Sequence, residues 1–249
     1  MTAKRAATKG PARPAGVAFF DFDNTLIRGD AGPLFGRSLI RARLHERSRL
    51  GRMSLRARYL PYILWMALQA VLYELRARRR SSLVRSAYRG LKGVPVAEFD
   101  GLLADFVDAE IPQRIYPELR AEAERHLAAG RRCVIVTTGM EPLVRRALRH
   151  LPDGMEVIGC RMLHRDGKLT GRVVGPLFGV DKANILDAYA RALGVATADC
   201  WAYSDHLSDR QMLEAVGHGV TVNPKGRFRR LARRNGWQVL EPKAPDTAA

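Results

Sequence analysis

The chain has 249 residues, of which 47% are hydrophobic and 27% charged, and this balance excludes a globally disordered protein. A formal net charge of +17 suits a nucleic acid, an anionic membrane or a phosphorylated substrate as partner, as it also suits a face of solvated arginines. No zinc-finger spacing or basic stripe interleaved with aromatic residues indicates a nucleic-acid module. The three cysteines form no disulfide or metal pattern, which favours a reducing, cytoplasmic environment.

The chain begins with a polar tail, a short apolar run and a long helical region. Residues 1–15 are rich in Ala, Lys, Arg and Pro and lack the apolar stretch of a signal peptide, which predicts a disordered basic tail. Residues 17–20 (VAFF) are apolar and stop at Asp21, a pattern typical of a buried parallel strand. Residues 29–111 are rich in Arg, poor in β-branched residues and largely helical in pattern. They predict an all-helical cap inserted over a sheet.

One segment of the predicted cap carries no charge. Residues 59–73 read YLPYILWMALQAVLY, with Arg58 before them and Glu74 after them. As a helix, this run is roughly 22 Å long, which is short of a bilayer core of about 30 Å. A buried or interfacial helix is therefore favoured over a membrane span. Two interpretations stay open: the run packs inside the cap, or residues 59–75 make a peripheral membrane contact.

The second half of the chain repeats a helix, glycine, apolar strand and polar loop rhythm, which is typical of an open α/β sheet. This rhythm predicts an α/β fold with a three-layer, Rossmann-like parallel-sheet core built from residues 16–28 and 112–249. The predicted helices are 117–129, 141–150, 182–193 and 209–216, the strands are 133–136, 156–158, 200–203 and 219–222, and 163–174 is a hairpin.

Two carboxylates directly follow the first predicted strand, in the sequence Asp21-Phe22-Asp23-Asn24-Thr25. Open α/β sheets build their sites at the carboxyl ends of their strands. Carboxylates this close repel one another, and a hard divalent cation such as Mg²⁺ would resolve the conflict. A calcium loop counted from Asp21 would need Gly at its sixth position and Glu at its twelfth, but Leu26 and Gly32 stand there.

Other polar side chains follow later strands at the same predicted edge of the sheet. Taken singly, each has a plain interpretation: Lys182 as a surface lysine, Thr137 as a helix N-cap, and Asp209 as a charge favoured by a helix dipole. Asp205, like Asp209, comes just past the strand 200–203. Because all four lie at the same end of predicted parallel strands, we expect them to form one site with Asp21.

At these residues the chain resembles the haloacid dehalogenase superfamily of phosphotransferases. The likeness spans nearly all of the chain beyond the tail but is specific in four motifs: DFDNT at 21–25, Val136-Thr137, Lys182, and Asp205 with Asp209. The helical insertion between the first two motifs, and residues 204–224, resemble the phosphoserine-phosphatase-like branch (subfamily IB) with its helical C1-type cap. That branch places a glutamate shortly after the first motif, and residues 27–32 contain no clear match.

The resemblance implies a role for each site residue. Asp21 would attack phosphorus to form an aspartyl phosphate, and Asp23 would act as general acid and then as general base. The phosphoryl oxygens would be bound by three residues, Thr137, Thr138 and Lys182. Mg²⁺ would be held by Asp21, the backbone carbonyl of Asp23, and Asp205, with Asp209 in support.

The expected function is therefore that of a Mg²⁺-dependent phosphomonoester hydrolase (phosphatase) whose cap selects a small phosphorylated metabolite. One alternative is a phosphatase of an amphiphilic lipid or prenyl phosphate at a membrane surface, since residues 59–75 could receive such a substrate. Alternatives from another class are a non-catalytic binding protein, which the intact site residues oppose, and a nucleic-acid-binding protein based on the charge. The oligomeric state and the pathway are not determined by the sequence.

Overall fold

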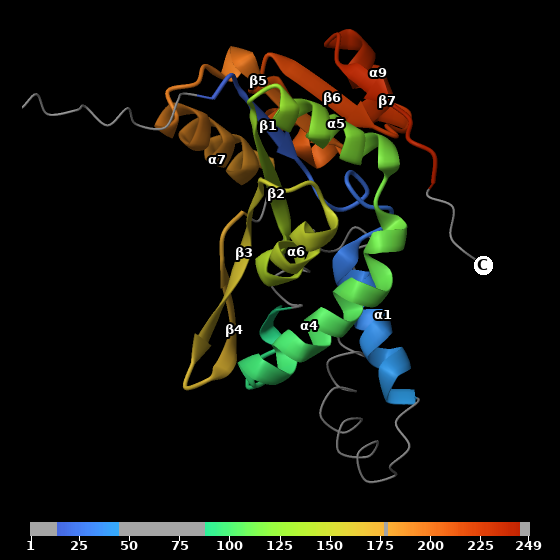
Figure 1. The fold of residues 1–249 in the computed structure, drawn as a ribbon, viewed down its shortest axis with the longest axis vertical. Coiled ribbons are helices and arrows are strands. Elements are labelled where there is room, and N and C mark those ends of the chain that lie inside the picture. The colour runs from blue at the N-terminus through green and yellow to red at the C-terminus, as the bar shows by residue number, and fades with distance from the viewer. Residues whose placement is uncertain (1–13, 45–87, 177–178, 245–249) are drawn as a thin grey trace, which may run out of the picture.

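The structure, a computed structural model, describes residues 14–44, 88–176 and 179–244 and contains a seven-stranded sheet (Figure 1). The strand order is β4-β3-β2-β1-β5-β6-β7, and every pairing is parallel except that of β4 with β3. The predicted α/β class with a Rossmann-like parallel sheet is confirmed. The strands are β1 (Val17–Phe20), β2 (Arg132–Met140), β3 (Met155–Arg165), β4 (Lys168–Val174), β5 (Cys200–Ser204), β6 (His218–Val222) and β7 (Gln238–Leu240).

Strand β1 lies at the centre of the sheet, between β2 and β5, and all four of its side chains are buried. Because side chains alternate along a strand, the apolar run supplies both faces. Ala18 and Phe20 belong to one hydrophobic cluster, and Val17 and Phe19 belong to the other. A continuous apolar run is what a parallel strand covered on both faces requires.

Helices cover both faces of this sheet and make three layers. Helices α5 (Pro117–Ala128) and α6 (Glu141–Ala147) pack on the face that Phe20 enters. The opposite face is covered by α7 (Gly179–Ala192), α8 (Arg210–Glu214) and α9 (Gly226–Arg234). Short 3-10 turns lie at Pro112–Arg114, Leu148–His150, Thr197–Asp199 and Leu207–Asp209.

Two further helices lie beyond the sheet, in the lower part of Figure 1: α1 (Ala31–Leu44) and α4 (Val96–Glu110). Phe35 of α1 packs against Phe99 and Phe106 of α4, with ring centroids 5.8 and 5.4 Å apart. Both helices fall within the predicted cap. The apolar run 59–73 and the first 13 residues of the predicted tail lie outside the described residues.

Several element boundaries differ from those predicted. β2 continues through Met140, where a loop was expected after Val136, because Met140 still pairs with Cys160 after a register shift. α7 begins at Gly179, so Lys182 lies within its first turn rather than at its start. α9 and β7 were not predicted, since five of the nine residues of α9 are arginines and mask its short apolar stripe. No described helix is long and apolar enough to cross a membrane.

Candidate active site

Asp21 stands directly after β1, at the carboxyl end of the central strand. Its backbone N–H donates to the carbonyl of Tyr203 on β5 (2.9 Å), which holds the residue in line with the sheet. The backbone N–H of Phe22 donates to Oδ1 of Asp21 (2.8 Å). The carboxylate is therefore oriented by the backbone that follows it, and the Asp21 side chain is only 11% exposed.

Lys182 joins two of the predicted acidic residues. Its Nζ lies 2.8 Å from Oδ1 of Asp21 and 2.7 Å from Oδ2 of Asp209. The three side chains come from the end of β1, the first turn of α7 and the turn before α8, and all are buried. The fold thus brings together residues separated by up to 188 positions in the chain.

Burial and charge shift the pKa values of this buried triad. Burial raises the pKa of Asp21 to about 6; the Lys182 ammonium opposes this rise and Asp209 adds to it. Burial by itself would lower the pKa of Lys182, but the two carboxylates outweigh it and raise that pKa. Lys182 therefore stays protonated at neutral pH, and it supplies one positive charge between two carboxylates.

Asp23 is placed by the first helix of the predicted cap. The backbone N–H of Ala31, the first residue of α1, donates to Oδ1 of Asp23 (2.7 Å). Burial, followed by the repulsion from Asp21, raises the pKa of Asp23 to about 7. A carboxyl group with a pKa near 7 suits general acid–base work at neutral pH, since both of its forms are available there.

Thr137 lies near Asp23, because both side chains approach the same side of Gly139. A Cβ atom added to Gly139 would stand 3.1 Å from Oγ1 of Thr137 and 3.6 Å from Oδ2 of Asp23. Thr137 is buried, and its Oγ1 accepts a hydrogen bond from the backbone N–H of Gly139 (2.9 Å). Thr138 is half-buried next to it on β2. The lack of a side chain at Gly139 keeps this space open between the hydroxyl and the carboxylate.

Residues 205–209 follow β5 and carry Asp205 and Asp209, and we call them the acidic loop. Two buried hydroxyl groups that were not predicted as site residues connect this loop to its surroundings. Oγ1 of Thr25 accepts a hydrogen bond from the backbone N–H of Asp205 (3.1 Å), which fixes this loop to the first motif. Oγ of Ser204 donates to Oδ2 of Asp209 (3.0 Å) and accepts from the backbone N–H of His206 (3.2 Å). The position of Ser204 at a strand end, directly before Asp205, was the available sequence signal.

The oxygen atoms at the carboxyl end of β1 are of the chemical type that binds a hard divalent cation. No group of three or more His, Cys, Asp or Glu side chains within the described ranges is placed to hold a metal. Mg²⁺ does not require such a group, because it retains several waters and binds through one or two carboxylates. The carboxylates of Asp21 and Asp205 and the carbonyl of Asp23 are hard oxygen donors, the ligand type that Mg²⁺ prefers. The raised pKa of Asp21 also indicates a place where a cation would stabilise the carboxylate.

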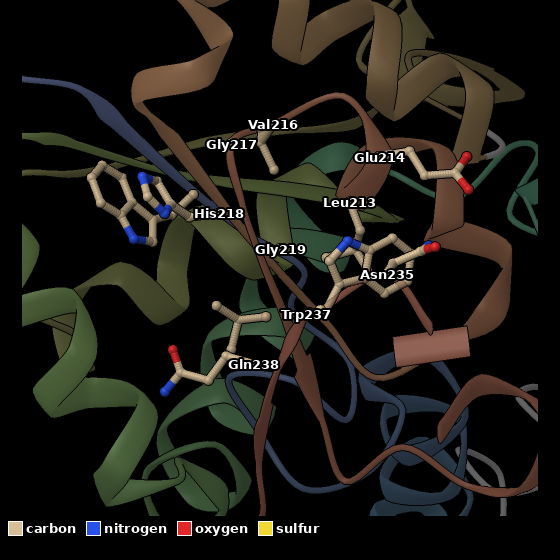
Figure 2. A pocket seen from close by; sticks show the side chains of 12 residues that line it. Leu213, Glu214, Val216, Gly217, His218, Gly219, Asn235, Trp237 and Gln238 are labelled. Carbon is tan, nitrogen blue, oxygen red and sulfur yellow. The ribbon is translucent and has the colours of Figure 1, made fainter. Parts of the chain in front are cut away.

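A cavity of about 440 Å³ lies elsewhere in the molecule (Figure 2). Its lining includes His218, Trp237 and Gln238, which stand where β6 and β7 begin. These are the amino ends of the strands, whereas Asp21 and Asp205 follow the carboxyl ends. The cavity is therefore at the opposite end of the sheet from the candidate site.

Comparisons with known proteins show the family of this chain. The sequence matches the haloacid dehalogenase-like hydrolase family over residues 18–214. Phosphoserine phosphatase SerB1 of Mycobacterium tuberculosis is 32% identical over 240 residues, which cover 94% of this chain and 73% of that protein.

Two solved structures share the fold. A protein of unknown function from Bordetella pertussis has a TM-score of 0.72 at 23% identity, over 90% of this chain and 97% of the other. A phospho-aspartyl intermediate analogue of phosphoserine phosphatase has a TM-score of 0.60 at 18% identity, over 92% and 94%. At these identities the likeness shows the fold. Together with the family match, it establishes that the chain belongs to the haloacid dehalogenase-like hydrolases and is a phosphatase of their phosphoserine-phosphatase-like branch.

Proposed function

We propose that this phosphatase hydrolyses phosphomonoesters with Mg²⁺, through a phosphorylated Asp21. The observation that carries the proposal is the buried triad, in which Lys182 lies 2.8 Å from Asp21 and 2.7 Å from Asp209. A buried nucleophilic carboxylate repels a phosphate dianion unless cations offset the charge. Lys182 supplies one such cation, and Asp209 holds it in place.

In the first step an oxygen of the Asp21 carboxylate forms a bond to phosphorus while the bond from phosphorus to the ester oxygen breaks. Asp23 gives its proton to that oxygen, so the product leaves as a neutral alcohol. In the second step Asp23 takes a proton from water, and the hydroxide oxygen forms a bond to phosphorus while the bond from phosphorus to the Asp21 oxygen breaks. Phosphate leaves and the Asp21 carboxylate is restored. A pKa of about 7 supports both roles of Asp23.

We assign the binding of the phosphoryl group to Thr137, Thr138 and Lys182. The Thr137 hydroxyl is near Asp23, and the Lys182 ammonium touches Asp21, so both groups border the space where phosphorus would lie. Hydrogen-bond donors and a fixed cation at that position stabilise the charge on the equatorial oxygens in the transition state.

We assign Mg²⁺ to Asp21, Asp205 and the backbone carbonyl of Asp23, with Asp209 acting in support. When bound, the ion neutralises negative charge on the phosphoryl group and on Asp21. The hydrogen bond from the backbone N–H of Asp205 to Thr25 orients the loop that carries this ligand.

We further propose that residues 29–111 form the cap and select a small phosphorylated metabolite in the cytoplasm. The similarity to phosphoserine phosphatase SerB1 favours such a substrate. Within the described residues, α1 contacts the site directly, because the backbone N–H of Ala31 donates a hydrogen bond to Asp23. An amphiphilic lipid or prenyl phosphate is the second candidate substrate, based on the uncharged run 59–73.

The test is phosphate release from a panel of phosphomonoesters, including detergent-dispersed lipid phosphates, with Mg²⁺ or EDTA. Wild type is compared with Asp21→Asn and with Asp187→Asn, which makes the same change on the exposed side of α7. We expect turnover that requires both Mg²⁺ and Asp21 and is unaffected at Asp187. Equal activity of Asp21→Asn and wild type would exclude the aspartyl-phosphate route, and activity that survives EDTA would exclude the metal.

A further inference from the structure

Helix α9 presents a surface made almost entirely of positive charge. Phe228 and Ala232 are buried against the sheet and fix which side of the helix faces inward. On the outer side five exposed cations follow one another, which we call the α9 cationic surface: Lys225, Arg227, Arg230, Arg233 and Arg234. The helix lies at the β7 edge of the sheet, towards the upper right in Figure 1.

The described part of the chain does not neutralise this surface. α9 contains no acidic residue. Its remaining arginine, Arg229, is half-buried and pairs with Glu241. Glu241 is the acidic residue nearest to α9 in the sequence, and this pair already occupies it. Among the ion pairs formed within residues 14–44, 88–176 and 179–244, none involves a member of the α9 cationic surface.

The positions of these cations also oppose helix stability. Lys225 is the N-cap and Arg227 is in the first turn, where the helix dipole disfavours positive charge. Arg230 lies three residues after Arg227 and four before Arg234, so like charges repel along the same face. Only the arginines of the last turn complement the dipole. The surface therefore costs the folded protein free energy that an external anion would recover.

We propose that the α9 cationic surface docks on an anionic phospholipid bilayer. A cluster of four to eight basic residues on an amphipathic helix matches anionic headgroups by charge. Single-stranded nucleic acid fits less well, because such binding adds aromatic platforms on which bases stack. The exposed large apolar side chains within the described part of the chain are Leu163, Val174 and Val180, none of them aromatic and none on α9.

The test compares vesicles of phosphatidylcholine with vesicles that also contain phosphatidylserine, using sedimentation of the full chain. The variant carries four changes, Arg227→Gln, Arg230→Gln, Arg233→Gln and Arg234→Gln. Each basic residue near an anionic surface raises the partition coefficient about fivefold, so we expect the variant to lose roughly several hundredfold on the anionic vesicles. Neither protein should bind vesicles of phosphatidylcholine alone, and added salt should release the wild type.

A matched control removes the same charge at the opposite edge of the sheet, on the β3–β4 hairpin. Its four exposed cations are changed to glutamine: Arg161, Arg165, Lys168 and Arg172. We expect this control to lose much less binding than the α9 variant. A third variant replaces the four α9 arginines by lysine, which keeps the charge, and it should bind as wild type does. Thermal unfolding of every variant reports on the fold.

Three results would overturn the proposal. The first is wild-type protein that stays in the supernatant with anionic vesicles. The second is an equal loss in the α9 and hairpin variants, which would show that net charge rather than this surface drives binding. The third is binding to duplex or single-stranded RNA that is tighter than binding to vesicles at the same salt and depends on the α9 arginines. That result would assign the surface to nucleic acid.

Discussion

Replacing Lys182 by methionine tests the physical basis of the site most directly. The Lys182 side chain is 2% exposed, and its ammonium pairs with two carboxylates that are themselves buried, Asp21 at 2.8 Å and Asp209 at 2.7 Å. Methionine fills a similar volume but leaves the two carboxylates facing each other without a cation. Removing one partner of a buried ion pair costs about 3–5 kcal/mol. Since the whole stability of a domain is about 5–15 kcal/mol, this loss is large.

The assay is urea unfolding of wild type, Lys182→Met, Asp209→Asn and the double variant. In the double variant one of the two uncompensated carboxylates is gone. We therefore expect its loss to be smaller than the sum of the single losses by about 0.5–3 kcal/mol, the usual coupling between contacting groups. Lys168→Met, a change at an exposed lysine of β4, should stay within about 0.5 kcal/mol of wild type. Additive losses, or a Lys182→Met variant as stable as wild type, would refute the reasoning.

Three further predictions concern pH and packing. If Asp23 is the general acid, as we propose, its pKa of about 7 means that kcat for an ester with a poor leaving group should fall above pH 7. Burial and the neighbouring arginines lower the pKa of His126 from 6.5 to about 4. The unfolded chain therefore binds the proton more tightly, and the contribution of His126 to stability should fall by up to about 3 kcal/mol as the pH drops from about 6.5 to about 4. Urea unfolding of wild type and His126→Gln at several pH values checks this, because the difference between the two proteins isolates this histidine from Asp21 and Asp23. Gly219→Ala would place a Cβ atom 2.5 Å from the Trp237 ring and should lower the free energy of unfolding in urea by about 1–3 kcal/mol. In Gly101→Ala, on helix α4, the new Cβ meets no atom within 4 Å, and the free energy of unfolding should rise by about 0.5–1 kcal/mol.

The elements with a strong local pattern could be predicted from the sequence. The VAFF run became β1 at the centre of the sheet, because a strand covered on both faces must be apolar throughout. The hairpin was also predicted, because Asp-Gly favours a tight turn between two strands. In the structure Asp166 and Gly167 both adopt the positive φ that such a turn requires. α9 was missed: its apolar stripe is short, and its partners on the sheet come from distant parts of the chain.

For the site, the sequence by itself determined which residue types follow which strands, and parallel topology then placed Asp21, Thr137, Lys182 and the acidic loop at one edge. Local pattern could not decide which groups touch. Residues of separate elements meet where Lys182 contacts the carboxylates of Asp21 and Asp209. They also meet where the backbone N–H of Ala31 donates a hydrogen bond to Asp23. Their distances, and the pKa values that depend on burial, exist only once the sheet and its helices have packed together.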